Sequence, residues 1–214
     1  MDNDKDKKGL DPAVALEASG DYRVLRKLPR RREFSAEDGA AKMGVILDIE
    51  TTGLNPASDE VIELGMLKFS FSSDGRVFKV VDEFEAFREP GVPIPAEVIE
   101  LTGITAEMVA GKVILPDKVS AFVQDAVLVI AHEARFDRPF CEALFPVFAT
   151  RYWACSNSDV DWRARGHRGT KLTYLLNASG ISTRGTAPSM TAWRSSSKDL
   201  IFSRPPRFSI ASRK

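Results

Sequence analysis

Three apolar, strand-like segments follow one another between residues 44 and 90, and they limit the folds open to this chain. VILDIE at 45–50 is a nearly continuous apolar run, which predicts a buried strand. EVIELGMLKFSFSS at 60–73 largely alternates, and SSDG at 72–75 signals a hairpin before a returning strand, KVVDEFEAFREP at 79–90. The sequence therefore predicts three antiparallel strands at the start of the domain.

Helices and strands alternate after this point. The expected helices are short and amphipathic or proline-punctuated: 95–103, 105–111, Pro116 to Asp125, 136–148 and 171–180, the last ending at Gly180. The expected further strands are compact and apolar, AVLVIAH at 126–132 and RYWACS at 151–156. Antiparallel strands followed by this alternation indicate a mixed α/β sandwich.

Composition divides the chain into three parts. Residues 1–42 form a charged arm with a helical candidate from Pro12 to Ser19 and a basic stretch at 22–34, and residues 43–182 form the domain. The arm is either solvated and poorly ordered or a phosphate or partner contact, and the residues alone leave both open. Residues 183–214 are rich in Ser, Arg and Pro without apolar periodicity, so they do not continue the fold.

The net charge of zero hides two unlike segments. Residues 183–214 carry seven basic residues and one acid, so the preceding 182 residues carry a net charge of −6. A domain this acidic does not attract nucleic acid by bulk charge, so nucleic-acid binding must be local or bridged by metal. No apolar run is long enough for a membrane span and the N-terminus has no secretory signal. Two cysteines without ligand spacing, Cys141 and Cys155, suit a reducing cytosol, so we expect a cytoplasmic protein without a membrane partner.

Asp48 and Glu50 are the first residues that suggest chemistry. On a strand, residues two apart point to the same face, so both carboxylates converge within an apolar segment. Two like charges there repel each other and lose hydration, and a divalent cation such as Mg²⁺ or Mn²⁺ would compensate. The alternative is a strand end where both acids reach water. The pair alone does not decide between them.

Four strings occur in an order typical of one enzyme family. They are DIETTGLNP at 48–56, IELG at 62–65, AHEARFD at 131–137 and KLTYLL at 171–176. In this order and spacing they resemble the DEDD superfamily of 3′→5′ exonucleases, in its DnaQ-like branch, which contains the proofreading epsilon subunit of bacterial DNA polymerase III. The resemblance covers residues 44 to 181. Glu133 stands where the family usually has Asn.

The resemblance implies a ribonuclease H-like fold with a mixed five-stranded sheet and a two-metal site for Mg²⁺ or Mn²⁺. Asp48, Glu50 and Asp137 would hold the ions, and Glu50 would also position the attacking water. Asp137 taken alone could be an acid that interacts with a helix dipole.

The resemblance also implies a site for the terminal nucleotide. Thr51, Thr52 and Leu54 would hold it, and Phe136 would pack beside the site, although Phe136 could equally be a core aromatic. The implied reaction is hydrolysis at single-stranded DNA 3′ ends, with a DNA polymerase subunit as a candidate partner. The alternatives are an exoribonuclease of the same superfamily and a non-catalytic nucleic-acid- or polymerase-binding module.

Two residues of the family pattern are missing. The family has a histidine general base and a fourth carboxylate in a string like GHRAxxDD, after the KLxxLL helix. Gly166-His167-Arg168 precedes that helix and no Asp follows within ten residues, so it is not this pair. His132, a lone histidine at a strand end, favours a structural role.

A shifted reading frame would account for the missing string. Residues 181–196 read ISTRGTAPSMTAWRSS, and codons can be chosen for them that, with one T inserted in codon 182, spell IFHEGHRAVDDCMALL. We therefore predict that residues 183–214 are an out-of-frame tail, the alternative being a divergent C-terminus. The last helix of the fold would then be missing, and activity would fall because loss of a positioned base costs ~10² to 10⁴ in rate.

Overall fold

The computed structural model describes residues 11–26 and 32–182. The tail predicted at 183–214 therefore lies outside the described residues, as do Lys27, Arg30 and Arg31 of the basic stretch.

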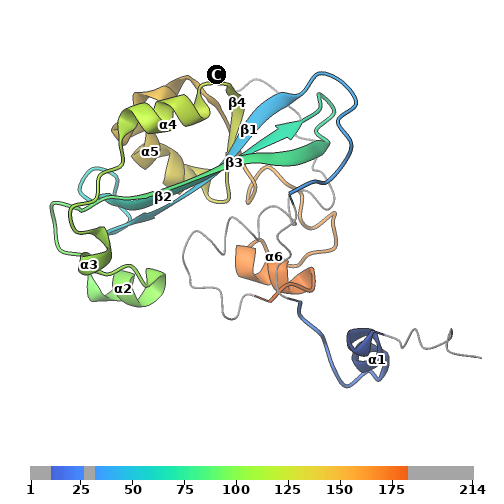
Figure 1. The fold of residues 1–214 in the computed structure, drawn as a ribbon. Coiled ribbons are helices and arrows are strands. Elements are labelled where there is room, and N and C mark those ends of the chain that lie inside the picture. Colours follow the sequence, from blue (N-terminus) through green and yellow to red (C-terminus); the bar gives the residue numbers. More distant parts are fainter. Residues whose placement is uncertain (1–10, 27–31, 183–214) are drawn as a thin grey trace, which may run out of the picture.

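A mixed five-stranded sheet organises the domain (Figure 1). Its strands are β1 (Lys42–Thr51), β2 (Val61–Phe71), β3 (Val77–Phe87), β4 (Ala126–Ala131) and β5 (Tyr152–Cys155). The strand order is β3-β2-β1-β4-β5, with β1–β2 and β2–β3 antiparallel and β1–β4 and β4–β5 parallel. This confirms the predicted ribonuclease H-like arrangement of three antiparallel strands followed by parallel ones.

The helices lie close to their predicted positions. They are α1 (Pro12–Ala18), α2 (Ala96–Thr102), α3 (Ala106–Val109), α4 (Pro116–Val123), α5 (Ala134–Leu144), the 3₁₀ helix η1 (Pro146–Thr150) and α6 (Leu172–Ala178). The helix expected at 136–148 begins two residues earlier and is divided, because Phe145 is extended and Pro146 opens η1. Pro139 lies inside α5 without ending it.

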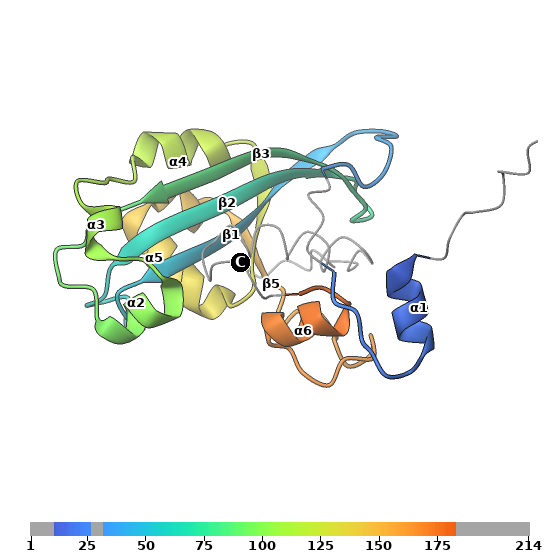
Figure 2. The ribbon, with the colours of Figure 1, turned by 60° about the horizontal axis from the view of Figure 1, so that its bottom comes forward.

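The two faces of the sheet carry different layers. Alternate residues of β1, including Val45 and Leu47, pack with α4 and α5 in the larger core cluster. Ile46 points to the other face, where a smaller apolar cluster meets Phe34 of the arm and Leu172 of α6. Figures 1 and 2 show α4 and α5 on one side of the sheet and α6 on the other. Because side chains alternate along β1, its odd-numbered residues face α4 and α5 and its even-numbered residues face the other layer.

The described part of the arm packs against the domain through backbone hydrogen bonds. The backbone N–H of Phe34 donates to the Phe78 carbonyl at 2.8 Å and Val80 N–H donates to the Arg32 carbonyl at 2.8 Å, which extends the sheet beyond β3. Arg26 forms a parallel bridge with Ile181, just after α6. The arm thus contacts both the β3 edge and the segment after α6.

None of the helices in the described ranges is long and apolar enough to cross a membrane.

Candidate active site

Asp48 and Glu50 are two residues apart on β1, so their side chains lie on the same face of the sheet. This is the face that α4 and α5 do not cover. Both lie near the C-terminal end of β1, where Asp48 pairs with Gly65 of β2 and Glu50 pairs with Glu63. Gly65 places no side chain opposite Asp48. Both acids are half-buried, so the strand holds them at the border between the core and solvent.

Asp137 reaches this strand from α5. Because β4 runs parallel to β1 and is its neighbour, both strands end at the same edge of the sheet, and α5 begins there. Asp137 lies in the first turn of α5 and is 2% exposed. Its Oδ1 accepts a hydrogen bond of 3.3 Å from the backbone N–H of Ile49, the residue between the two β1 acids. The structure therefore places Asp137 against the segment of β1 that carries Asp48 and Glu50.

The electrostatics of this cluster disfavour bare carboxylates. Burial raises the pKa of Asp48 well above its usual value, and the charges of Asp137, Glu50 and Glu63 raise it further. Burial also raises the pKa of Glu50 to about 7. Burial raises the pKa of Asp137 to about 8, despite the opposing hydrogen bond from Ile49. Such a site takes up either protons or a cation.

Glu63 is a fourth acid of this cluster that sequence reasoning did not single out. It is 0% exposed, sits opposite Glu50 in the β1–β2 register, and its charge helps to raise the pKa of Asp48. The available signal was its position in VIELGML, since an acid in a strand whose neighbours are all apolar is seldom buried without a role.

The side chains of this cluster have the donor atoms that a divalent cation prefers. Carboxylate oxygens are the hard ligands that Mg²⁺ and Mn²⁺ prefer, and a cation among Asp48, Glu50 and Asp137 would stabilise the ionised forms that burial disfavours. Over residues 11–26 and 32–182, however, no three His, Cys, Asp or Glu side chains are grouped so that they could hold one ion together. The chemistry of the cluster fits a cation, while the side chains as placed do not enclose one.

The loop after β1 holds the residues predicted to bind the terminal nucleotide. A β-bulge between Glu50 and Thr51 shifts the register where β1 ends. Thr51 and Thr52 are buried and close the loop: the Thr51 hydroxyl donates to the Gly53 carbonyl at 2.5 Å, and the Thr52 Oγ1 accepts from the backbone N–H of Glu60 at 2.9 Å. A side chain at position 53 would meet the Asp59 carboxylate at 2.6 Å, so the glycine permits this tight turn.

Leu54 differs from the two threonines. Its side chain is 83% exposed, so the loop presents an apolar group to solvent directly after the acidic strand. Exposed leucines are common, but one held at the tip of a hydrogen-bonded loop has a fixed place in which to contact a ligand.

Phe136 is partly buried beside the larger core cluster, with its ring centroid 5.2 Å from that of Phe140. Phe136 therefore packs against the core, and in the sequence it immediately precedes Asp137 of the acidic cluster.

The two histidines of the chain are both described, and both are engaged elsewhere. His132 Nε2 donates to the Thr170 carbonyl at 2.8 Å, which leaves Nδ1 to pair with the Ser156 hydroxyl at 2.9 Å; burial lowers the pKa of this imidazole. The His167 ring lies edge-on to Trp162 and Tyr174, with centroids 5.6 and 6.3 Å away. Neither histidine occupies the place of a general base beside the carboxylates.

Comparisons with known proteins agree with this fold. A DNA polymerase III PolC-type from Caldanaerobacter subterraneus subsp. tengcongensis is 37% identical over 142 residues, covering 60% of this chain and 10% of the polymerase. The PolC-type polymerase of Thermotoga maritima is 34% identical over 160 residues, covering 72% of this chain and 10% of that protein. The chain thus spans about one tenth of the length of these relatives.

Solved structures share the fold at low identity. The E. coli ExoI–ssDNA complex in its zinc-bound form superimposes with a TM-score of 0.59 and 17% identity, over 78% of this chain and 42% of that one. Exonuclease X in complex with 5′ overhanging duplex DNA gives a TM-score of 0.51 and 20% identity, over 75% of this chain and 92% of that one.

The family model for the RNase_T exonucleases matches residues 45–175, which is more than half of the chain and includes all three carboxylates. That match, together with the PolC-type relatives, is in line with the motif order read from the sequence. The chain therefore belongs to the RNase_T exonuclease family, within the DEDD, DnaQ-like superfamily.

Proposed function

We propose that this chain is a metal-dependent 3′→5′ exonuclease that hydrolyses phosphodiester bonds at single-stranded DNA 3′ ends. One observation carries the proposal: the Asp137 carboxylate of α5 accepts a hydrogen bond from the backbone N–H of Ile49, the residue between Asp48 and Glu50 on β1. Membership of an exonuclease family supports the reaction class.

Members of this family are generally dependent on divalent metal. In this chain Asp48, Glu50 and Asp137 would hold a pair of Mg²⁺ or Mn²⁺ ions, which when bound supply Lewis-acid stabilisation of charge on phosphate oxygens. Glu50, at the solvent border of the cluster, would orient the attacking water. The buried Glu63 adds negative charge behind these ligands.

The residues around the β1–β2 loop would bind the terminal nucleotide. Leu54 would contact the nucleobase through its exposed side chain, while Thr51 and Thr52 keep the loop in place through their hydroxyl groups. Phe136 would support Asp137 from the adjacent helical position. A DNA polymerase subunit is the proposed protein partner, since PolC-type DNA polymerases are among the relatives of this chain. The proposed location is the cytoplasm, because both cysteines are free and buried.

A second candidate function is a non-catalytic module that binds nucleic acid or a polymerase. The observation that favours it is the state of the two histidines, both held away from the carboxylates by their own contacts. A chain without a positioned base would bind an end without cleaving it efficiently.

The experiment is a time course on a 5′-labelled single-stranded DNA oligomer with Mg²⁺ or Mn²⁺, with an RNA oligomer of the same sequence in parallel. The proposal expects a ladder that shortens from the 3′ end, disappears with EDTA and disappears in Asp48→Ala. Asp82→Ala is the control, because it removes an exposed acid of β3 outside the cluster. No metal-dependent shortening of either oligomer at high protein concentration would support the non-catalytic module. Faster loss of RNA would assign the chain to exoribonucleases.

A further inference from the structure

The segment between β5 and α6, residues 156–171, is called here the β5–α6 loop. Its interior is held by its own hydrogen bonds. The Trp162 indole N–H donates to the Ser156 carbonyl at 2.7 Å, and the backbone N–H of His167 donates to the Trp162 carbonyl at 2.9 Å. The backbone N–H of Arg168 donates to the Tyr174 hydroxyl at 2.9 Å. The loop therefore presents its side chains from a defined backbone.

The β5–α6 loop is attached to the junction that positions Asp137. His132, at the end of β4, binds Ser156 and Thr170 near both ends of the loop. The Asn157 side chain donates to the carboxylate of Glu133, whose backbone carbonyl accepts from the N–H of Asp137. Because β5 is parallel to β4, the loop also leaves the sheet at the edge where β1 and β4 end. In open α/β sheets, ligands bind at this carboxyl edge.

The loop is basic within an otherwise acidic domain. It carries Arg163, Arg165, Arg168 and Lys171 against two acids, Asp159 and Asp161. Both acids are used to shape the loop. Asp159 accepts from the Cys155 N–H at 2.8 Å, and Asp161 accepts from the Ala164 N–H at 2.8 Å.

Three of the basic side chains stand out from those of the arm. Arg163, Arg168 and Lys171 are exposed, and they form no ion pair with any other described residue.

The arginines of the arm, by comparison, already have partners in the chain. Arg23 donates to the Asn177 carbonyl, Arg26 pairs with Asp11 at 3.1 Å and Arg32 pairs with Glu83 at 3.0 Å. The described arginines of the basic arm are therefore engaged within the chain, whereas Arg163, Arg168 and Lys171 of the loop lie outside the ion pairs of the described residues.

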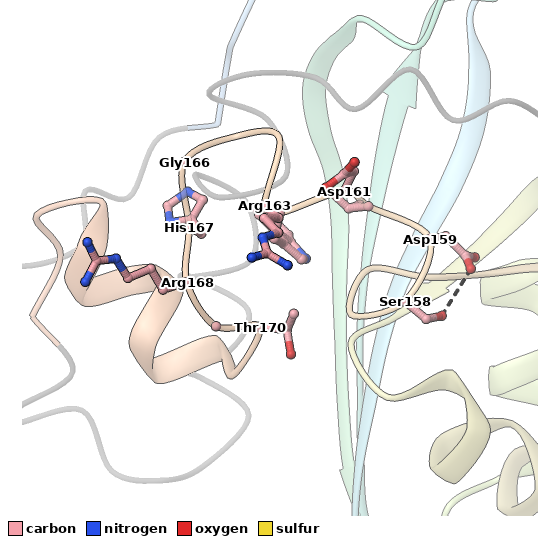
Figure 3. Close-up of a pocket in the computed structure, with 11 residues that line it drawn as sticks. Ser158, Asp159, Asp161, Arg163, Gly166, His167, Arg168 and Thr170 are labelled. Carbon is pink, nitrogen blue, oxygen red and sulfur yellow. Dashed lines mark hydrogen bonds between the residues drawn. The ribbon is translucent and has the colours of Figure 1, made fainter.

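The loop also borders a cavity of about 1040 Å³, lined by residues 158–163 and 166–170 (Figure 3). Figure 3 shows Arg163 and His167 on facing limbs of the loop, with Arg168 extending outward beyond them. Charges spread along a loop in this way suit a ligand with repeated charges better than one compact anion. A single-stranded nucleic acid is such a ligand, since each nucleotide adds one phosphate.

We infer that the β5–α6 loop binds the phosphodiester backbone of a single-stranded nucleic acid through Arg163, Arg168 and Lys171. This inference rests on the proposed function for the strand's direction, with the 3′ end at the carboxylates and the preceding nucleotides on the loop. The loop supplies the positive charge that the acidic cluster cannot, so it attracts the strand while the carboxylates act only at its end.

The test measures binding separately from cleavage. The full chain is titrated against a 5′-fluorescein-labelled oligothymidylate in EDTA, by fluorescence anisotropy, over a series of KCl concentrations. Arg163→Gln/Arg168→Gln is compared with Lys112→Gln/Lys118→Gln, which removes the same charge at exposed positions before and within α4. At ~0.7 per phosphate contact, the loop variant should reduce the slope of log Kd against log salt by about 1.4. Its affinity at low salt should fall roughly tenfold or more.

Circular dichroism and the thermal midpoint check that both variants fold. Binding by the loop variant that equals the control variant, or no binding by the parent chain, would overturn the inference. A weakened loop variant would support it even if no oligomer is cleaved with metal, because that result bears on the proposed function alone.

Discussion

The two faces of the sheet differ in the side chains that they bury. On one face, α4 and α5 cover a continuous apolar cluster in which Val45, Leu47 and Phe148 are 0% exposed. On the other, the same strand β1 presents Asp48 and Glu50, and β2 presents the buried Glu63. The odd-numbered residues of β1 thus pack in the α4–α5 core, while on the other face the buried Ile46 is followed by the proposed metal ligands Asp48 and Glu50.

The two faces contribute differently to the free energy of unfolding. Apolar burial on the α4–α5 face contributes about 25 cal/mol for each Å² removed from water. The raised pKa values of Asp48, Glu50 and Asp137 mean that ionising the carboxylates in the fold is unfavourable. Changes on the first face should therefore act on folding, and changes on the second mainly on catalysis and metal binding.

The largest expected effect is on the face that carries Asp48 and Glu50. Replacing residues 181–196 by IFHEGHRAVDDCMALL supplies the histidine and the fourth carboxylate that the family pattern requires, and nucleotide release should rise by ~10² to 10⁴. Single-turnover rates on the labelled oligomer give the measurement. Equal rates for the two chains would contradict the frameshift hypothesis, as would a gene sequence around codon 182 that cannot spell this string in the adjacent frame.

On the apolar face, Phe148→Ala should lower the free energy of unfolding by about 3–5 kcal/mol, because it empties a fully buried site. The Phe148 ring lies 6.2 Å from that of Phe145 and 5.8 Å from that of Trp153, so both neighbours lose a partner. Urea unfolding followed by tryptophan fluorescence measures the change. A loss below about 1 kcal/mol would mean that η1 is not part of the core.

The pH dependence of the unfolding free energy tests the acidic face without any change to the apolar core. With EDTA, unfolding free energy should fall as pH rises from about 4, the ordinary carboxyl value, through about 8, where Asp137 titrates. The fold holds protons that the unfolded chain has already released, so the sign is a loss of stability on raising pH, of the order of 2 kcal/mol. Mn²⁺ should restore it at high pH, as thermal midpoints will show. Asp48→Asn should flatten the dependence, and an unchanged slope would count against the cluster.

The smallest effect is expected from Leu54→Ala. Its side chain is 83% exposed, so the unfolding free energy should change by less than about 0.5 kcal/mol. If Leu54 contacts the terminal nucleobase, KM for the oligomer should rise about three- to fivefold through lost apolar contact. Steady-state kinetics give the result, and an unchanged KM would remove Leu54 from the nucleotide site.

The strands were predictable because their signal is local. Apolar runs and the SSDG turn predicted β1 to β3, and the motif order led to the parallel strands β4 and β5. The meeting of Asp137 with the β1 acids was implied by the resemblance. The bond from Ile49 to Asp137, 88 residues apart, is a tertiary contact that no local pattern contains.

Three features were out of reach of local reasoning for related reasons. Glu63 joins the acidic cluster only through the β1–β2 register, which places it opposite Glu50. The path of the arm depends on an unpaired edge at β3, which exists only once the sheet has formed. The contrast between committed and uncommitted arginines requires their partners to be in place.

The pairing of residues 32–35 with β3 has a consequence for self-association. An outer strand with open N–H and C=O groups is a template for another copy of the chain, and proteins commonly cover such edges. Here the arm covers this edge with its own backbone, through Arg32, Phe34 and Ser35. At the opposite border, β5 has only four residues, too few to align a second sheet easily. A chain cut before residue 40 would therefore expose β3 and should form strand-to-strand aggregates even though Asp48, Glu50 and Asp137 are all retained.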